Sequence, residues 1–156
     1  MKGIKRLFLP FILSMTFAGC AEKVYPDPSA FVFGSWYGFC IENCIHVYKL
    51  ENGKLYLDDM STRYQSEDIS FQMTPLDEKW AKKAQELYEL FPAYLNKNPN
   101  MTIGCPDCHD QGVLYLAFEG NEKPIEWKID PVETDYPPEI EIFMAAMKEL
   151  ISELPR

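Results

Sequence analysis

The Asn52-Gly53 pair lies between two apolar segments, residues 45–50 and 54–57. Both residues accept positive φ angles, so the pair strongly indicates a β-hairpin. A second hairpin is predicted from residues 113–118 and 125–129. Each hairpin precedes a segment whose apolar residues recur at helical spacing. This order predicts an α+β fold: one antiparallel sheet with two amphipathic helices on one face.

Proline marks the start of both predicted helices. In the first, Thr74 is the expected cap, Pro75 the first helical residue, and Pro92 should end or kink the last turn. The second helix begins near Pro137 and Pro138, and its apolar stripe includes Ile140, Phe143, Met147 and Leu154.

Three further strands are predicted, at residues 31–39, 69–73 and 101–104. In the first of these, Gly34 and Gly38 are expected bulge or bend points. The two halves of the chain each contain a cysteine pair, a hairpin and a helix. Two interpretations stay open, a degenerate ββα repeat and coincidence.

The N-terminal residues have the pattern of an export signal. Three basic residues precede the apolar segment 7–18, which is too short to cross a bilayer. The sequence Phe17-Ala18-Gly19-Cys20 resembles the lipobox of bacterial lipoproteins, although Phe17 departs from the usual Leu, Val or Ile. The resemblance implies cleavage before Cys20 and lipid attachment to its thiol. With Ala21 at the next position, it favours the outer over the inner membrane.

The expected organisation is a signal peptide at 1–19, a lipidated Cys20 with a proline-containing tether at 20–30, and one domain at 31–156. The chain has 15 basic and 24 acidic residues, and residues 1–19 hold three of the basic ones. The remainder therefore has a net charge of 12 − 24 = −12. Such a charge repels phosphate backbones and excludes nucleic-acid binding. The lipid on Cys20 is the expected membrane contact.

Four cysteines remain after Cys20, in two close pairs. In an oxidising compartment, disulfides are favoured over free thiols. Three pairings are open, and we expect Cys40–Cys44 and Cys105–Cys108 because each pair precedes its hairpin at a turn.

The sequence Cys105-Pro-Asp-Cys108-His109 also matches the motif for covalent haem attachment. That motif normally belongs to a helix, whereas here a turn into a strand follows. A four-thiolate zinc site and a thioredoxin-like dithiol are further alternatives, disfavoured by the compartment and by the lack of a following helix. We expect no cofactor and no metal.

His46 and a group of aromatic residues are the other site candidates. Alternation places His46 on the strand face opposite Ile45 and Val47, where an exposed or hydrogen-bonded role is expected rather than catalysis. Phe33, Trp36 and Tyr37 are the candidate binding surface, provided that one strand face stays uncovered. No nucleophile-elbow sequence or phosphate-binding glycine loop is present.

The C-x3-C of Cys40 and Cys44, followed by a Tyr48-containing hairpin with a glycine turn, resembles uncharacterised exported bacterial lipoproteins. The resemblance covers most of residues 34–154 and implies no known activity. The resulting hypothesis is a lipid-anchored envelope protein that binds an unknown protein or small molecule, or has a structural role, without catalysis. Two alternatives are an inhibitor of a basic enzyme such as lysozyme, and a haem or redox protein using Cys105, Cys108 and His109.

Overall fold

A computed structural model describes residues 29–38, 40–41, 44–60, 69–120, 123–132 and 135–156. The predicted signal peptide, Cys20 and most of the tether lie outside the described residues, as does Phe39. The strands are β1 (Ala30–Trp36), β2 (Ile45–Glu51), β3 (Lys54–Leu57), β4 (Thr102–Ile103), β5 (Val113–Glu119) and β6 (Ile125–Ile129). The helices are α1 (Glu78–Glu89), α2 (Ala93–Lys97) and α3 (Pro138–Glu153).

The strands form one sheet in the order β3-β2-β1-β5-β6-β4. Both predicted hairpins are present, β2–β3 and β5–β6, and β1 lies antiparallel between them. The short strand β4 pairs with β6 in parallel, so the sheet is mostly rather than entirely antiparallel. The fold is therefore α+β, as the sequence predicts.

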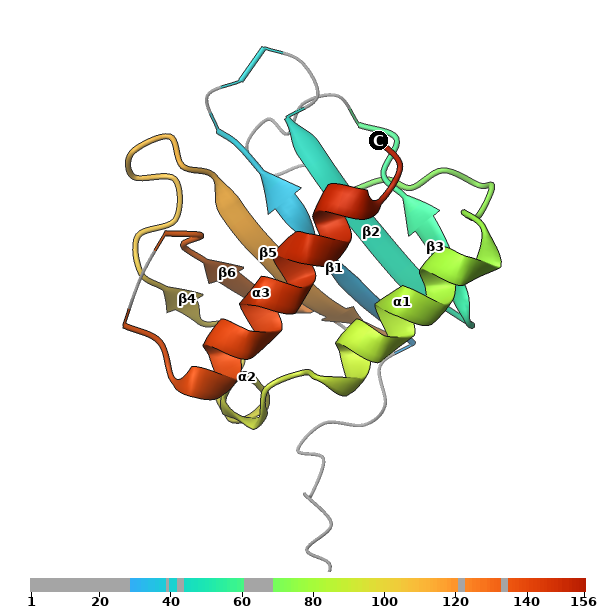
Figure 1. The fold of residues 1–156 in the computed structure, drawn as a ribbon. Coiled ribbons are helices and arrows are strands. Elements are labelled where there is room, and N and C mark those ends of the chain that lie inside the picture. Colours follow the sequence, from blue (N-terminus) through green and yellow to red (C-terminus); the bar gives the residue numbers. More distant parts are fainter. Residues whose placement is uncertain (1–28, 39, 42–43, 61–68, 121–122, 133–134) are drawn as a thin grey trace, which may run out of the picture.

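Helices α1 and α3 lie on the same face of this sheet (Figure 1). The main core between the helices and the sheet includes Phe33, Leu116 and Trp127 from the strands, and Ala84 and Phe143 from the helices. All five side chains are fully buried. Burial of aromatic and aliphatic surface on this scale is the main stabilising contribution to the fold.

The start of helix α1 differs from the prediction. Helix α1 begins at Glu78, after Asp77 rather than after Thr74, and no side chain caps it. Its end agrees with the sequence, because Pro92 separates α1 from the short helix α2. Helix α3 has proline in its first turn, as expected.

A smaller apolar cluster covers part of the opposite face of the sheet. Val32, Val47 and Tyr115 are buried there, and Phe71 packs against them. The strand predicted at residues 69–73 is not formed, because only a single bridge joins Phe71 to Asp58. This segment covers the sheet face instead of extending the sheet.

Gly34 is not the bulge that the sequence suggested. It keeps regular register in β1, opposite Val47 on one side and Tyr115 on the other. A Cβ atom at Gly34 would lie 2.2 Å from the carbonyl oxygen of His46 and 2.5 Å from the Cα of Val47. Glycine is required at this position because two strand backbones approach closely.

The two ββα units have opposite hand. Strands β2 and β5 run in the same direction, because both are antiparallel to β1, and both helices lie on one face. However, β3 and β6 lie on opposite sides of their partners. No rotation superimposes the units, so the topology does not form the repeat that the sequence suggested as one interpretation.

Within the part of the chain that the structure describes, no helix has the length and apolar character needed to cross a membrane.

Candidate ligand-binding site

The two cysteine-containing loops lie side by side at one end of the sheet. This follows from the register, because Trp36 at the end of β1 pairs with Val113 at the start of β5. The carboxylate of Asp107 joins the loops: Oδ2 accepts the N–H of Gly38 at 2.9 Å, and Oδ1 accepts the N–H of Gly112 at 3.2 Å. Segments about 70 residues apart in sequence are therefore held together.

The structure pairs the cysteines locally. Cys40 is joined to Cys44 and Cys105 to Cys108, with Cα–Cα distances of 5.5 Å and 5.6 Å. Both distances lie in the usual range for disulfides. Of the three pairings that the sequence left open, the structure has the one we expected.

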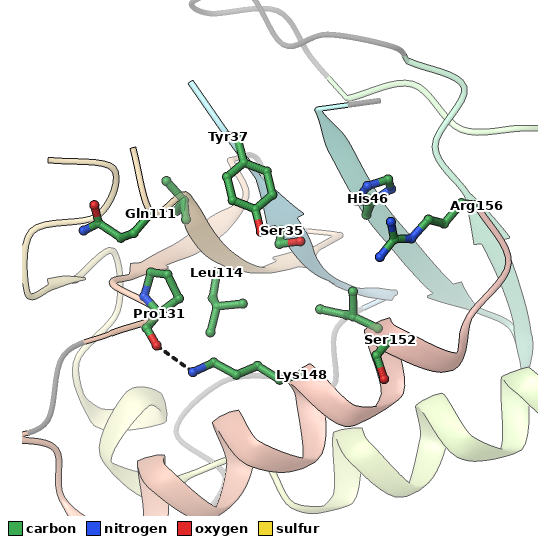
Figure 2. Close-up of a pocket in the computed structure, with 11 residues that line it drawn as sticks. Ser35, Tyr37, His46, Gln111, Leu114, Pro131, Lys148, Ser152 and Arg156 are labelled. Atoms are coloured by element: carbon green, nitrogen blue, oxygen red, sulfur yellow. Dashed lines mark hydrogen bonds between the residues drawn. The ribbon is translucent and has the colours of Figure 1, made fainter. Parts of the chain in front are cut away.

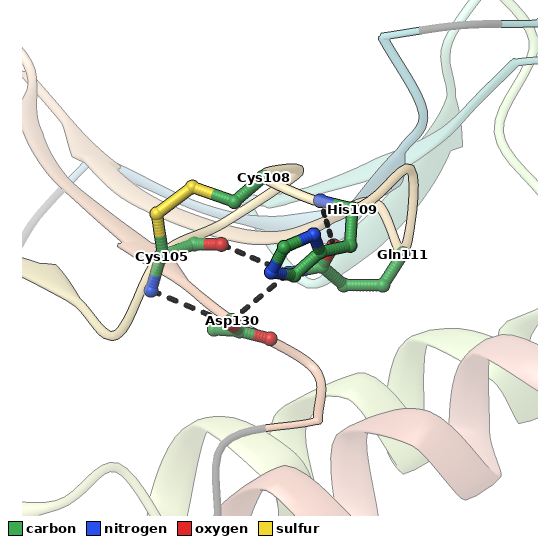
Figure 3. The surroundings of a disulfide bond; sticks show 5 residues. All are labelled: Cys105, Cys108, His109, Gln111 and Asp130. Atoms are coloured by element: carbon green, nitrogen blue, oxygen red, sulfur yellow. Dashed lines mark hydrogen bonds between the residues drawn. A yellow bond between two sulfur atoms is a disulfide. The ribbon is translucent and has the colours of Figure 1, made fainter.

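The Cys105–Cys108 loop is fixed by hydrogen bonds to Asp130 and Gln111 (Figure 3). The Asp130 carboxylate accepts the Cys105 N–H at 3.3 Å and the Gln111 amide at 3.1 Å. That amide also donates to the Cys105 carbonyl at 2.8 Å, and its oxygen accepts the His109 N–H at 2.7 Å. Gln111 is therefore held from several directions.

This geometry bears on the haem and redox alternatives. Haem attachment requires both sulfurs as thioethers, but here they are bonded to each other. Residues 106–109 form a turn that leads into β5, not a helix. A helix N-terminus of the kind that stabilises a reactive thiolate is therefore not present after Cys108. Among the described residues, no group of three or more His, Cys, Asp or Glu is placed to hold a metal ion.

A pocket of about 290 Å³ lies beside these loops, between the C-terminal part of α3 and the helix-covered face of the sheet (Figure 2). This space equals that of roughly ten water molecules. Its wall is drawn from β1, β2, β5 and α3 and from the loops between elements. The lining residues are Ser35, Tyr37, His46, Gln111, Val113, Leu114, Pro131, Lys148, Ile151, Ser152 and Arg156.

His46 is the buried polar residue of this wall, with 9 % of its surface exposed. Sequence alternation correctly placed it on the face of Tyr48, but it is neither exposed nor bound through its ring to any described residue. Burial lowers the pKa of His46, the positive charge of Arg156 lowers it further, and Asp58 opposes both. The imidazole is therefore neutral near pH 7, with one donor and one acceptor nitrogen.

Two cationic side chains complete the polar wall. Figure 2 shows the Arg156 guanidinium beside His46, and Lys148 on the α3 side of the pocket. The Lys148 ammonium donates to the carbonyl of Pro131 at 2.6 Å, which uses one of its three N–H groups. Among the described residues, no carboxylate forms an ion pair with Lys148 or Arg156.

None of the described residues that line the pocket is acidic, although the chain has 24 Asp and Glu residues. Two carboxylates that interact with lining residues, Asp58 with His46 and Asp130 with Gln111, bind backbone N–H groups. Asp58 accepts the N–H groups of Val47 at 2.8 Å and Met60 at 3.0 Å, and Asp130 accepts that of Val132 at 2.9 Å. Their negative charge is thus partly satisfied outside the pocket.

The structure corrects the candidate surface of Phe33, Trp36 and Tyr37. Phe33 is fully buried under the helices, and Trp36 packs with the cluster on the opposite face. Tyr37 is 45 % exposed and lines the pocket. The three residues cannot form one surface because β1 is covered on both faces.

Ser35 and His46 are opposite each other in the β1–β2 pairing and both line the pocket. No hydrogen bond joins their side chains within the described part of the chain, so the nucleophile–base contact typical of hydrolases is not formed. Apolar groups of Val113, Leu114 and Ile151 line the rest of the pocket. The arrangement is suited to binding a small ligand that has both polar and apolar parts.

No protein-family model matches this chain, and neither the curated proteins nor the solved structures give a significant match.

Proposed function

We propose that this protein is a lipid-anchored binding domain of the bacterial cell envelope that holds a small ligand without catalysis. The observation that carries the binding role is the pocket of about 290 Å³ into which the buried His46 faces. Two disulfide loops lie at the same end of the sheet, and the pocket residue Gln111 is hydrogen-bonded to one of them. Loops closed in this way lose less conformational freedom when a ligand binds.

The anchoring part of the proposal rests on the sequence. The basic residues, the short apolar segment and the lipobox-like residues 17–20 support lipid attachment at Cys20. Attachment of more than one acyl chain gives stable membrane anchoring. Because Ala21 follows Cys20, we place the protein at the outer membrane.

Intact mass of the membrane-extracted protein tests the anchor. We expect a chain that begins at Cys20 and carries added acyl mass, with four thiols that react with an alkylating reagent only after reduction. The Cys20→Ser variant should lose the acyl mass. Wild-type protein with no acyl mass, or with residues 1–19 still attached, would contradict the anchoring proposal.

Ligand-observed NMR on the anchored protein in nanodiscs tests the pocket, with empty nanodiscs as the blank. The probes are single-ring acids, amides and alcohols. Ser152 lines the pocket from the last turn of α3, so the ring of Ser152→Phe should fill it. The substitution should not disturb the fold, because Ser152 is exposed and its hydroxyl bonds only within that helix. Ser152→Ala is the matched control. If every probe binds Ser152→Phe as well as it binds Ser152→Ala, the pocket is not a binding site.

A further inference from the structure

The charge of the pocket has the opposite sign from that of the protein as a whole. The described residues of its lining include Lys148, Arg156 and the buried His46 but no Asp or Glu, in a domain with a large acidic excess. A random sample of this surface would include acidic residues more often than basic ones. The local excess of N–H donors therefore points to a ligand of negative charge.

The two cationic side chains lie at different ends of the pocket wall (Figure 2). Arg156 presents a planar guanidinium beside His46, and Lys148 extends from α3 with N–H groups that Pro131 does not use (Figure 2). A guanidinium fork matches the two oxygens of a carboxylate, and the positive charge of an ammonium elsewhere in the same pocket adds a favourable field. Ser35 adds a hydroxyl group to the same wall.

The remaining wall limits the size and polarity of the ligand. Val113, Leu114 and Ile151 supply aliphatic surface, and Tyr37 supplies a ring. A volume of about 290 Å³ admits a compact molecule of roughly ten non-hydrogen atoms, not a polymer. A fully polar anion would leave the aliphatic surface without a partner.

We infer that the pocket binds a small organic anion, a carboxylate on a compact apolar body, with Arg156 and Lys148 as the charge-recognising residues. This inference rests on the proposed binding function and specifies its ligand class. Ser35 and His46, which are opposite each other in the β1–β2 pairing, orient the charged group, and the aliphatic residues hold the apolar body.

Benzoate and benzamide form the test pair, because they share shape and size and differ in charge. The experiment uses the anchored protein in nanodiscs and ligand-observed NMR titration. We expect benzoate to bind at least about tenfold more tightly than benzamide, the loss typical of one charge-assisted bond. The double variant Lys148→Gln/Arg156→Gln should remove that preference, so that benzoate and benzamide bind with similar affinity.

The double variant Lys54→Gln/Lys97→Gln is the matched control. It removes the same charge from exposed positions that do not line the pocket. Equal loss of benzoate binding in both double variants would refute the inference, since it would show a general field effect. Equal binding of benzoate and benzamide, or binding of neutral probes alone, would refute the anion preference but leave the binding function intact. If no probe of any kind binds the pocket, both proposals fail.

Discussion

Among the described residues, the carboxylate of Asp130 binds three donors that come from different parts of the chain. Its Oδ2 accepts the Cys105 N–H at 3.3 Å and the Gln111 amide at 3.1 Å, and its Oδ1 accepts the Val132 N–H at 2.9 Å. The Asp130→Asn variant keeps the shape but offers one oxygen and one amide group. The remaining oxygen of asparagine can take the place of either Oδ2, with its two bonds, or Oδ1, with its one bond. The NH2 group of asparagine then points at an N–H donor in the other place, where it cannot accept a hydrogen bond.

The cost follows from these contacts. A hydrogen bond to a charged group contributes about 1.5–3 kcal/mol, and a neutral one about 0.5–1.5 kcal/mol. In the better orientation, one charge-assisted bond is lost and two become neutral. Partial relaxation of the loop reduces this sum, so we expect a loss of about 2–4 kcal/mol. For a domain of this size, that loss lowers the unfolding temperature by roughly 10 °C.

Thermal unfolding of the oxidised protein measures this effect. Asp110→Asn is the matched control, because it makes the same chemical change at an exposed residue of the loop to which Asp130 is hydrogen-bonded. Asp110 has a φ of 58°, which asparagine tolerates. If the two variants unfold at the same temperature, the Asp130 carboxylate does not hold this end of the sheet.

Three other substitutions test the fold. Gly34→Ala should lower the free energy of unfolding by about 2–4 kcal/mol in chemical denaturation, because its Cβ would meet backbone atoms of β2. Gly53→Ala is the control: its Cβ meets no atom, so it should lose only about 1 kcal/mol through its positive φ. Similar losses in the two variants would refute the close-approach argument. Trp127→Phe should lose about 1–3 kcal/mol in the same assay, since the indole N–H donates to two carbonyls at the end of α2; an unchanged midpoint would show that these bonds contribute nothing. Burial raises the pKa of Tyr48 from 10.0 to about 12, so above pH 10 the unfolded chain releases a proton that the folded chain retains. Stability should therefore fall as pH rises from 10 to about 12, and Tyr48→Phe should flatten this decline; an equal decline in both proteins would assign it to other groups.

The hairpins and helices were predictable because their signals are local. Asn52 and Gly53 adopt the positive φ values, 51° and 70°, that their sequence indicated. The proline positions likewise marked the start of α3 and the end of α1. The central position of β1 and the parallel pairing of β4 depend on contacts between distant segments, for which a single sequence carries no local signal.

The pocket was missed for the same reason. Lys148 and Arg156 belong to a helical pattern and the residues after it, with nothing in the sequence to show that they line one pocket. The Tyr48 hydroxyl donates to the Pro155 carbonyl at 2.9 Å, a contact across 107 residues that brings the segment after α3 over the strand that contains His46. The alternation of β2 did predict the face of His46, but the cover that buries it comes from the other end of the chain.

The inhibitor hypothesis stays a prediction, tested by salt-dependent binding to a basic hydrolase.

The local disulfides are better explained by the shape of the site than by the stability of the domain. A link that closes three or four residues contributes about 2 kcal/mol by chain entropy, whereas one closing roughly 60 residues contributes about 4 kcal/mol. A cross-link between the halves would therefore stabilise the fold more. The two local disulfides lie in the loops that follow β1 and precede β5. The Asp107 carboxylate joins these two loops. Their main effect is to limit the conformations of the segments that present Tyr37, Gln111 and His46, as expected if this end of the sheet is where the protein binds its ligand.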